Sequence, residues 1–223
     1  MNEFLKIFMT AAVLVPATLL PIINPLAGAP IFLSVTSGHE PLARDMARRV
    51  AINCFFLLVG ALLVGGYVLE FFGLSIPIVQ VAGGLFVATT GWRLLNDASQ
   101  DAIRRSIADS TGQLSDVEIA QHSFMPMSFP LTVGPGTIAA TIALGSTRPD
   151  EASDLVPQAL GALLGLAVSV ALIYLTYRYS GPLLQRLGRT GTMVLMRLAA
   201  FILLCIGIDI LWSGVAALAR ADL

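Results

Sequence analysis

The chain has 223 residues, of which 56% are hydrophobic and 12% are charged, and its mean hydropathy is +0.82. Soluble domains carry about 25% charged residues, so the composition excludes an ordinary soluble domain and indicates an integral membrane protein. The formal net charge of −1 gives no reason to expect a nucleic-acid partner.

Six hydrophobic segments are long enough to cross a bilayer, which takes about 20 apolar residues. We therefore predict an all-α polytopic protein with six transmembrane helices in the lipid bilayer. A polar loop, residues 96–122, separates the third segment from the fourth, and Ser115 and Glu118 have the spacing of a capping box there. The six segments are Phe4–Thr36, Val50–Leu69, Ile76–Leu95, Ser123–Ser146, Leu155–Tyr177 and Thr192–Leu218.

The first segment contains Pro21, Pro25 and Pro30 within ten residues, together with Gly28. Proline removes a backbone donor, clashes with the preceding turn and pushes the residue before it out of helical geometry. The segment is also too long for one straight span, because its helix would extend about 50 Å. We predict two half-helices around an unwound stretch, the second starting at about Pro30. A break inside a membrane is tolerated only where protein or water surrounds it.

The fourth segment contains a similar break, at Met125–Thr137, where Pro126, Pro130 and Pro135 occur. We predict that its second half-helix starts at about Thr137. By contrast, the fifth segment has no break and carries Gly161-x-x-x-Gly165, which is typical of a close-packing helix face.

The two breaks predict an internal repeat. Pro16 and Pro25 are separated by the same nine residues as Pro126 and Pro135, which places Asn24-Pro25 opposite Gly134-Pro135. An odd number of spans in each copy makes the second copy enter from the opposite side, as in many secondary transporters. The predicted organisation is a first three-helix repeat (1–95), a cytoplasmic loop (96–122) and a second, inverted three-helix repeat (123–223).

In this arrangement the second half-helices of both broken spans start near mid-membrane. Helix N-termini carry unpaired N–H groups and a partial positive charge, and they suit a carboxylate or another anion. We therefore expect a substrate-binding site between the two breaks. Its candidate residues are Asn24, Pro25, Gly28, Thr132, Gly134, Pro135, Gly136 and Thr137.

The positions of lysine and arginine predict the orientation. Ten of these side chains fall on the side of the loops after spans one, three and five, and three fall on the other side. Both termini are therefore expected outside and the 96–122 loop inside. An inner interfacial belt of tyrosines is expected at Tyr174, Tyr177 and Tyr179.

Asp209 is the one acidic residue well inside a span. Acids at this depth are costly and are functional by default, so Asp209 is a candidate for ion coupling or for binding a substrate ammonium. A structural role as the partner of a basic side chain stays open. Cys54 and Cys205 both lie in apolar segments and indicate no disulfide or metal site. We predict no enzymatic activity, catalytic residue, metal or cofactor, since no hydrolase or zinc-protease motif occurs.

The residues around both breaks resemble those of the MarC family, a group that includes proteins described as small neutral amino-acid transporters. The resemblance rests on residues 23–34, INPLAGAPIFLS, and residues 129–138, FPLTVGPGTI. It implies a six-span protein of the bacterial inner (plasma) membrane with a transport role.

Our leading hypothesis is a secondary transporter for a small zwitterionic or anionic solute, such as a neutral amino acid, with a proton or sodium ion as the coupling partner. Two alternatives stay open. One is a structural or assembly membrane protein whose breaks only pack, and the other is a channel or exporter without a tight site. The sequence leaves the existence of a homo-oligomer undecided.

Overall fold

The computed structural model describes residues 3–36, 40–96, 123–146 and 152–221. The predicted capping box at Ser115 and Glu118 lies outside these residues. All elements within them are helical. In chain order they are α1 (Glu3–Ile23), α2 (Pro25–Val35), α3 (Glu40–Phe71), α4 (Ile76–Asn96), η1 (Ser123–Thr132), α7 (Pro135–Ser146), η2 (Ala152–Asp154), α8 (Leu155–Arg178) and α9 (Ser180–Ala221).

Five of the described helices are long and apolar enough to cross a membrane, and a sixth crossing is counted if η1 and α7 form one bent span. The all-α prediction is therefore confirmed, with five to six candidate spans. The predicted third and fifth segments match α4 and α8 within one residue. The second predicted segment corresponds to α3, which begins at Glu40, ten residues earlier than predicted. The sixth corresponds to α9, which begins at Ser180 and is interrupted at Gly188, where φ is 64°.

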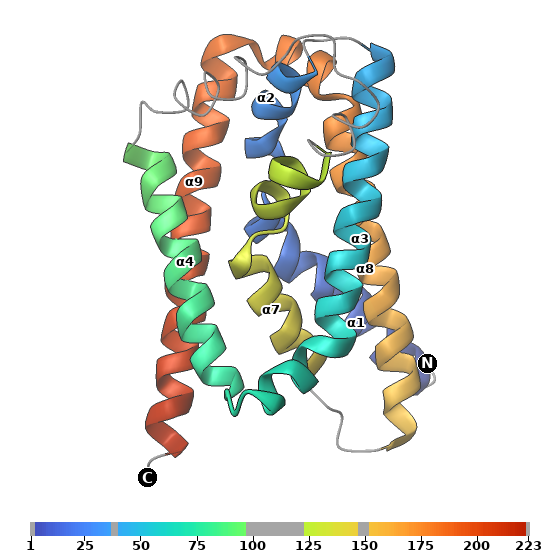
Figure 1. The fold of residues 1–223 in the computed structure, drawn as a ribbon, viewed down its shortest axis with the longest axis vertical. Coiled ribbons are helices and arrows are strands. Elements are labelled where there is room, and N and C mark those ends of the chain that lie inside the picture. The colour runs from blue at the N-terminus through green and yellow to red at the C-terminus, as the bar shows by residue number, and fades with distance from the viewer. Residues whose placement is uncertain (1–2, 37–39, 97–122, 147–151, 222–223) are drawn as a thin grey trace.

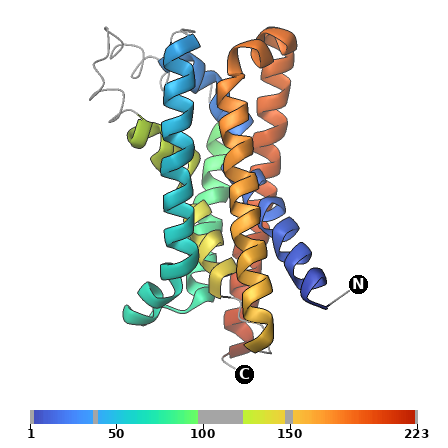
Figure 2. The same ribbon diagram turned by 90° about the vertical axis from the view of Figure 1, so that its right-hand side faces the viewer.

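The helices form a bundle with short helices at its centre (Figure 1). α4 and α9 pack against each other along their length at one side, while α1 packs on α8, and α3 packs on both α7 and α8. Seen from the side, α1 is steeply tilted relative to the long helices (Figure 2). The short helices α2 and α7 therefore lie between the two groups of long helices.

Small residues allow the close contacts in this bundle. A Cβ added at Gly161 or Gly165 would collide with Phe8, Val15 and their neighbours on α1. The predicted close-packing role of the Gly161-x-x-x-Gly165 face is thus confirmed, and its partner is α1. Glycines matter here because lipid provides no hydrophobic drive for helix association, so backbones must approach closely to gain dispersion energy.

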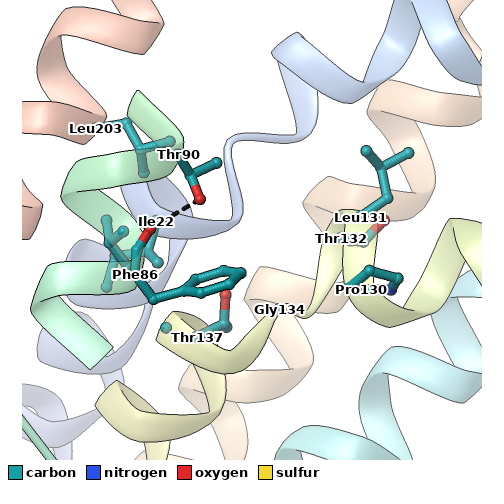
Figure 3. A pocket seen from close by; sticks show the side chains of 11 residues that line it. Ile22, Phe86, Thr90, Pro130, Leu131, Thr132, Gly134, Thr137 and Leu203 are labelled. Carbon is teal, nitrogen blue, oxygen red and sulfur yellow. Dashed lines mark hydrogen bonds between the residues drawn. The ribbon is translucent and has the colours of Figure 1, made fainter. Parts of the chain in front are cut away.

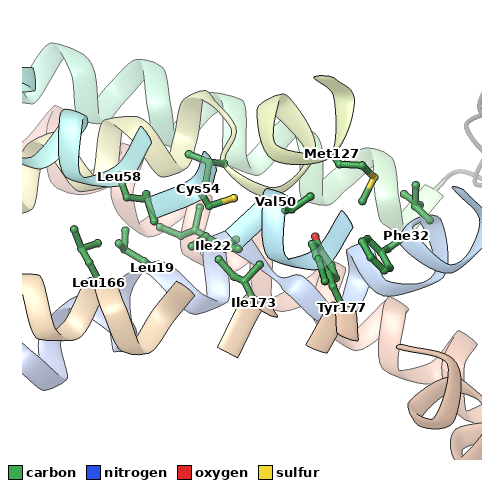
Figure 4. Close-up of a cluster of buried hydrophobic side chains, with 14 of the residues drawn as sticks. Leu19, Ile22, Phe32, Val50, Cys54, Leu58, Met127, Leu166, Ile173 and Tyr177 are labelled. Atoms are coloured by element: carbon green, nitrogen blue, oxygen red, sulfur yellow. The ribbon is translucent and has the colours of Figure 1, made fainter. Parts of the chain in front are cut away.

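The buried core runs along the inward faces of α1, α3 and α8 (Figure 4). It continues between α2 and η1, where Phe32, Met127 and Tyr177 are almost completely buried. The Phe32 and Tyr177 rings stack with their centroids 4.8 Å apart and their planes 7° apart. The prediction that Tyr177 belongs to an interfacial belt is therefore wrong, because its ring is enclosed by protein on all sides.

Candidate functional site

The helical path of the first hydrophobic segment is interrupted at Asn24, where φ is 45°. Pro25 follows as the first residue of α2, a position that suits proline because its N–H is not needed there. The Asn24 side-chain oxygen accepts a hydrogen bond from the Ala27 N–H at 3.3 Å and so caps α2. The predicted start of this half-helix near Pro30 is thus wrong by five residues, because the cap is the Asn24–Pro25 pair.

The Asn24 amide nitrogen has no hydrogen-bond partner although its surface is covered. A buried donor without an acceptor costs free energy comparable to a lost hydrogen bond. The break at Asn24 therefore carries one polar atom that the described residues do not satisfy.

The fourth hydrophobic segment is irregular for a related reason. Met125 and Phe129 have extended backbone angles (φ −122° and −128°), because each precedes a proline. α7 then begins at Pro135 and meets η1 at an angle of 67°. The start of α7 lies two residues before the predicted Thr137, and Gly134-Pro135 takes the place that Asn24-Pro25 has in the first segment.

A cavity of about 60 Å³ lies beside the start of α7 (Figure 3). This volume holds a few water-sized groups and is well below the roughly 300–1,000 Å³ of pockets that enclose drug-sized ligands. The last turn of α1, the middle of α4, η1, the start of α7 and Leu203 of α9 contribute to it. Its lining residues are Ile22, Phe86, Val87, Thr90, Pro130, Leu131, Thr132, Gly134, Gly136, Thr137 and Leu203.

The polar lining of this cavity is concentrated at the α7 N-terminus. The N–H groups of Gly136 and Thr137 belong to the first turn, where an α-helix has no internal acceptor for them. Thr137 is 3% exposed, and its hydroxyl makes no hydrogen bond with any residue that the structure describes. The cavity thus has two backbone donors and one free hydroxyl on the electropositive end of a helix.

The other buried hydroxyl of the lining, that of Thr132, is fully used. It donates to the Met127 carbonyl at 2.6 Å. Its single proton is thereby occupied, so the Tyr177 hydroxyl, 2.8 Å away, must be the donor in the bond between them. The same Tyr177 hydroxyl fills the space above Gly28, where an added Cβ would approach it to 2.5 Å. Tyr177 therefore ties η1 to α2 immediately beside the cavity.

Four of the predicted site residues, Thr132, Gly134, Gly136 and Thr137, line this cavity together. The other four do not line it, and these are Asn24, Pro25, Gly28 and Pro135. Among the residues that sequence reasoning missed are Phe86, Thr90 and Tyr177. No motif marks Phe86 or Thr90, which lie in an unbroken span and enter the site only because α4 packs on α7.

Asp209 does not line the cavity either. Its side chain is exposed on the surface of α9, and the α9 residue that does reach the lining is Leu203. The condition attached to its predicted coupling role, that it faces the cavity, is therefore not met in this conformation.

A second and larger cavity, of about 750 Å³, lies at the opposite end of α7. It is bounded by the last turns of α3 and α7, the turn into α4 and the first turns of α8. Its lining is mainly apolar, and its polar or ionisable members are Tyr67, Glu70, Ser75, Ser146 and Gln158. A wide opening therefore lies next to the C-terminus of the short helix whose N-terminus bears the small cavity.

The fold and these cavities define a polytopic helical membrane protein with a small polar site beside the start of a short internal helix. Comparison with known proteins agrees with this class. Residues 8–219 match the sequence pattern of a protein family described as MarC family integral membrane protein. This chain belongs to that family.

Named relatives are found in several bacteria. The UPF0056 inner membrane protein MarC of Salmonella typhimurium is 32% identical over 200 residues, covering 88% of this chain and 90% of the relative. The UPF0056 membrane protein YvbG of Bacillus subtilis is 30% identical over 198 residues, with the same coverage. No solved structure matches this chain. The relatives' names support a membrane location, the inner membrane for those named MarC.

Proposed function

We propose that this chain is a secondary transporter for a small solute that carries a carboxylate, either a neutral amino acid or a small anion. The carboxylate binds at the N-terminus of α7. The observation that carries the proposal is the free, buried hydroxyl of Thr137 beside the unpaired N–H groups of Gly136 and Thr137. These are hydrogen-bond donors on an electropositive helix end, and a carboxylate supplies only acceptors.

The size of the cavity supports a small solute. At about 60 Å³ it admits a carboxylate and little more. A whole amino acid requires the surrounding helices to move apart, which is the expected behaviour of a transporter that alternates between two states. A channel without a tight site needs no such group of donors gathered at one helix N-terminus.

Helix packing supports the inverted repeat. In this proposal α1 and α2 correspond to η1 and α7, α3 corresponds to α8, and α4 to α9. Exchanging the halves maps the α1–α8 contact onto the η1–α3 contact and the α2–α8 contact onto the α7–α3 contact. It also maps the α4–α7 contact onto the α9–α2 contact. A chance arrangement of six helices has no reason to show this pairing.

The seam between α4 and α9 gives the same indication at single residues. An added Cβ would meet the Gly207 carbonyl oxygen from Gly84 and the Ala200 carbonyl oxygen from Gly91. If Gly84 corresponds to Ala200 and Gly91 to Gly207, exchange of the halves turns one contact into the other.

The proposal also includes the orientation, with both termini outside. Its support is the excess of lysine and arginine on the opposite side, ten against three. In Figure 1 the start of α1 and the end of α9 point toward one end of the bundle, while α4 ends toward the other. Cysteine labelling of the intact membrane from each side tests this part of the proposal.

The test of function begins with a thermal-shift screen of the purified protein against amino acids and small carboxylates. A ligand that binds the folded state raises the melting temperature by mass action. Hits are then measured for uptake and for exchange in proteoliposomes, under an imposed proton or sodium gradient.

Thr137→Val removes the free hydroxyl and keeps the side-chain shape, so affinity for the solute should fall about five- to thirtyfold, as for a lost hydrogen bond of about 1–2 kcal/mol. Thr141→Val is the matched control: Thr141 is one turn further along α7, is buried, and already donates to the Thr137 carbonyl at 2.7 Å. Equal losses in both variants contradict the proposed site. A screen without any hit, in stability or in flux, favours a structural or assembly role.

A further inference from the structure

Asp209 occupies an unusual place for an acidic residue. It lies within the part of α9 that can span the membrane, Thr190–Arg220. Eleven residues separate it from Arg220, a rise of about 16 Å, which places it close to the middle of a hydrocarbon core about 30 Å thick. At this depth its side chain is exposed on the surface of the molecule. Acids inside spans normally face the bundle interior or a water-filled cavity.

The rest of the described chain supplies no partner for this carboxyl. Ion pairs among the described residues join Asp45 to Arg49 and Glu40 to Arg178, and no described residue hydrogen-bonds the Asp209 side chain. On α9 itself, Arg197 and Arg220 are about 16–18 Å away along the helix.

The neighbouring helix α4 offers no partner either. Its one basic residue within the span is Arg93. The contact of Gly91 with Leu204 places Arg93 near the level of residue 202, about two helical turns from Asp209.

The face around Asp209 points away from α4. Gly207, Leu211 and Gly214 form the seam with α4, and Asp209 lies on the opposite side of the helix. Phe201, Cys205 and Trp212 share that outer side at spacings of three and four residues, and all three are exposed. α9 thus has one face used for packing inside the chain and a second face with an acid at its centre.

We propose that a second copy of this chain covers the outer face of α9, with Asp209 of the two copies side by side. Copies related by a two-fold axis normal to the membrane place each residue at the same depth as its equivalent, so the two carboxyl groups meet without any shift of register. A carboxyl and a carboxylate that share one proton hydrogen-bond each other, and lipid tails offer no such partner. The interface is independent of which solute the protein transports.

Cys205 makes the test direct. It is exposed one turn before Asp209, and the only other cysteine, Cys54, is buried. In native membranes, copper phenanthroline should join two copies through Cys205 and produce a dimer on non-reducing gels. Cys205→Ser should abolish the dimer. Asp209→Leu should lower the dimer association constant, measured by the concentration dependence of mass in detergent, by about five- to thirtyfold, the effect of one interhelical hydrogen bond.

Two controls keep the result decisive. Leu164→Cys in the Cys205→Ser background places a thiol on the exposed surface of α8, where only random collision can cross-link it. Asp209→Asn keeps the shape and the hydrogen-bonding capacity and should retain the dimer. Cross-linking through Cys205 that does not exceed that through Leu164→Cys overturns the proposal. Efficient cross-linking that Asp209→Leu leaves unchanged overturns it as well, and unchanged melting temperatures establish that each variant is folded.

Discussion

The two ends of the short internal helices differ in how tightly they are packed. We call the end near Gly65 and Ile142 the outer end and the end near Tyr177 and Phe32 the inner end, following the proposed orientation. In the proposed repeat, the contact of Gly65 with Ile142 corresponds to the contact of Tyr177 with Phe32. At the outer end the helices border a cavity of about 750 Å³. At the inner end the equivalent space contains the stacked rings of Tyr177 and Phe32.

The same contrast holds between α8 and α3, which correspond to each other in the proposed repeat. Ala159 and Ala162 of α8 line the outer cavity. Their counterparts on α3, with the same offset that pairs Gly65 with Tyr177, are Ala47 and Val50, which are both 0% exposed. Two copies of one unit in different conformations are what alternating access requires. Under the proposed repeat and orientation, the difference corresponds to a conformation that is open at the outer end and packed at the inner end.

The largest expected effect concerns access from water. In a Cys205→Ser background, Ala159→Cys should react with a membrane-impermeant thiol reagent added from outside far faster than Ala47→Cys, because the first position borders the open cavity and the second is buried. Reaction rates in intact vesicles give the measurement. Similar labelling rates at the two positions, with the reagent added from either side, contradict the difference between an open outer end and a packed inner end.

The next effect concerns the inner packing itself. Tyr177→Ala removes a fully buried ring and its stacking contact with Phe32, and we expect the free energy of unfolding to fall by about 3–5 kcal/mol. Tyr67→Ala is the control at the outer cavity, where the residue is 65% exposed, and it should cost less than about 0.5 kcal/mol. Unfolding in mixed micelles compares the two, and equal losses contradict the asymmetry.

A smaller effect isolates the hydrogen bond from the ring. Tyr177→Phe keeps the stack on Phe32 and loses the bond to Thr132, which should lower stability by about 1 kcal/mol. Thr132→Val and the double variant complete a mutant cycle, and the coupling energy between the two side chains should also be about 1 kcal/mol. Tyr177→Phe should in addition raise the labelling rate of Ala47→Cys from the inner side, if the hydroxyl helps to keep that end closed. A coupling energy of zero between Tyr177 and Thr132 contradicts a stabilising role for their hydrogen bond.

The smallest effect is expected at the surface of the inner end. Arg178 and Glu40 join α8 to α3 there at 2.7 Å, and both side chains reach solvent. Glu40→Gln should lower the melting temperature slightly at low ionic strength, and the difference should vanish in high salt, since surface ion pairs are weak and screened. A loss that persists in high salt instead shows that the pair helps to hold the inner end together.

Some of the site was predictable from particular residues. Prolines at 25, 126, 130 and 135 mark the helix interruptions near Asn24 and at Met125–Gly134, since the residue before a proline tends to leave helical geometry. Pro21 and Pro30 were expected to interrupt the helix as well, but they lie inside α1 and α2. The cavity beside Thr132, Gly134, Gly136 and Thr137 followed from the rule that a break in a membrane must face protein or water. The start of α2 was misplaced because Pro25 and Pro30 are both acceptable first residues, and the asparagine cap decides between them.

The sequence by itself determined the apolar segments and the close-packing glycines of α8, because each depends on local composition. Only the tertiary structure decided which side of each helix faces the site. It brought Phe86 and Thr90 to the cavity, buried Tyr177 between η1 and α2, and turned Asp209 outward. The reason is that lipid tails and the protein core are equally apolar, so the pattern of apolar residues along a membrane helix does not fix its rotation about its own axis.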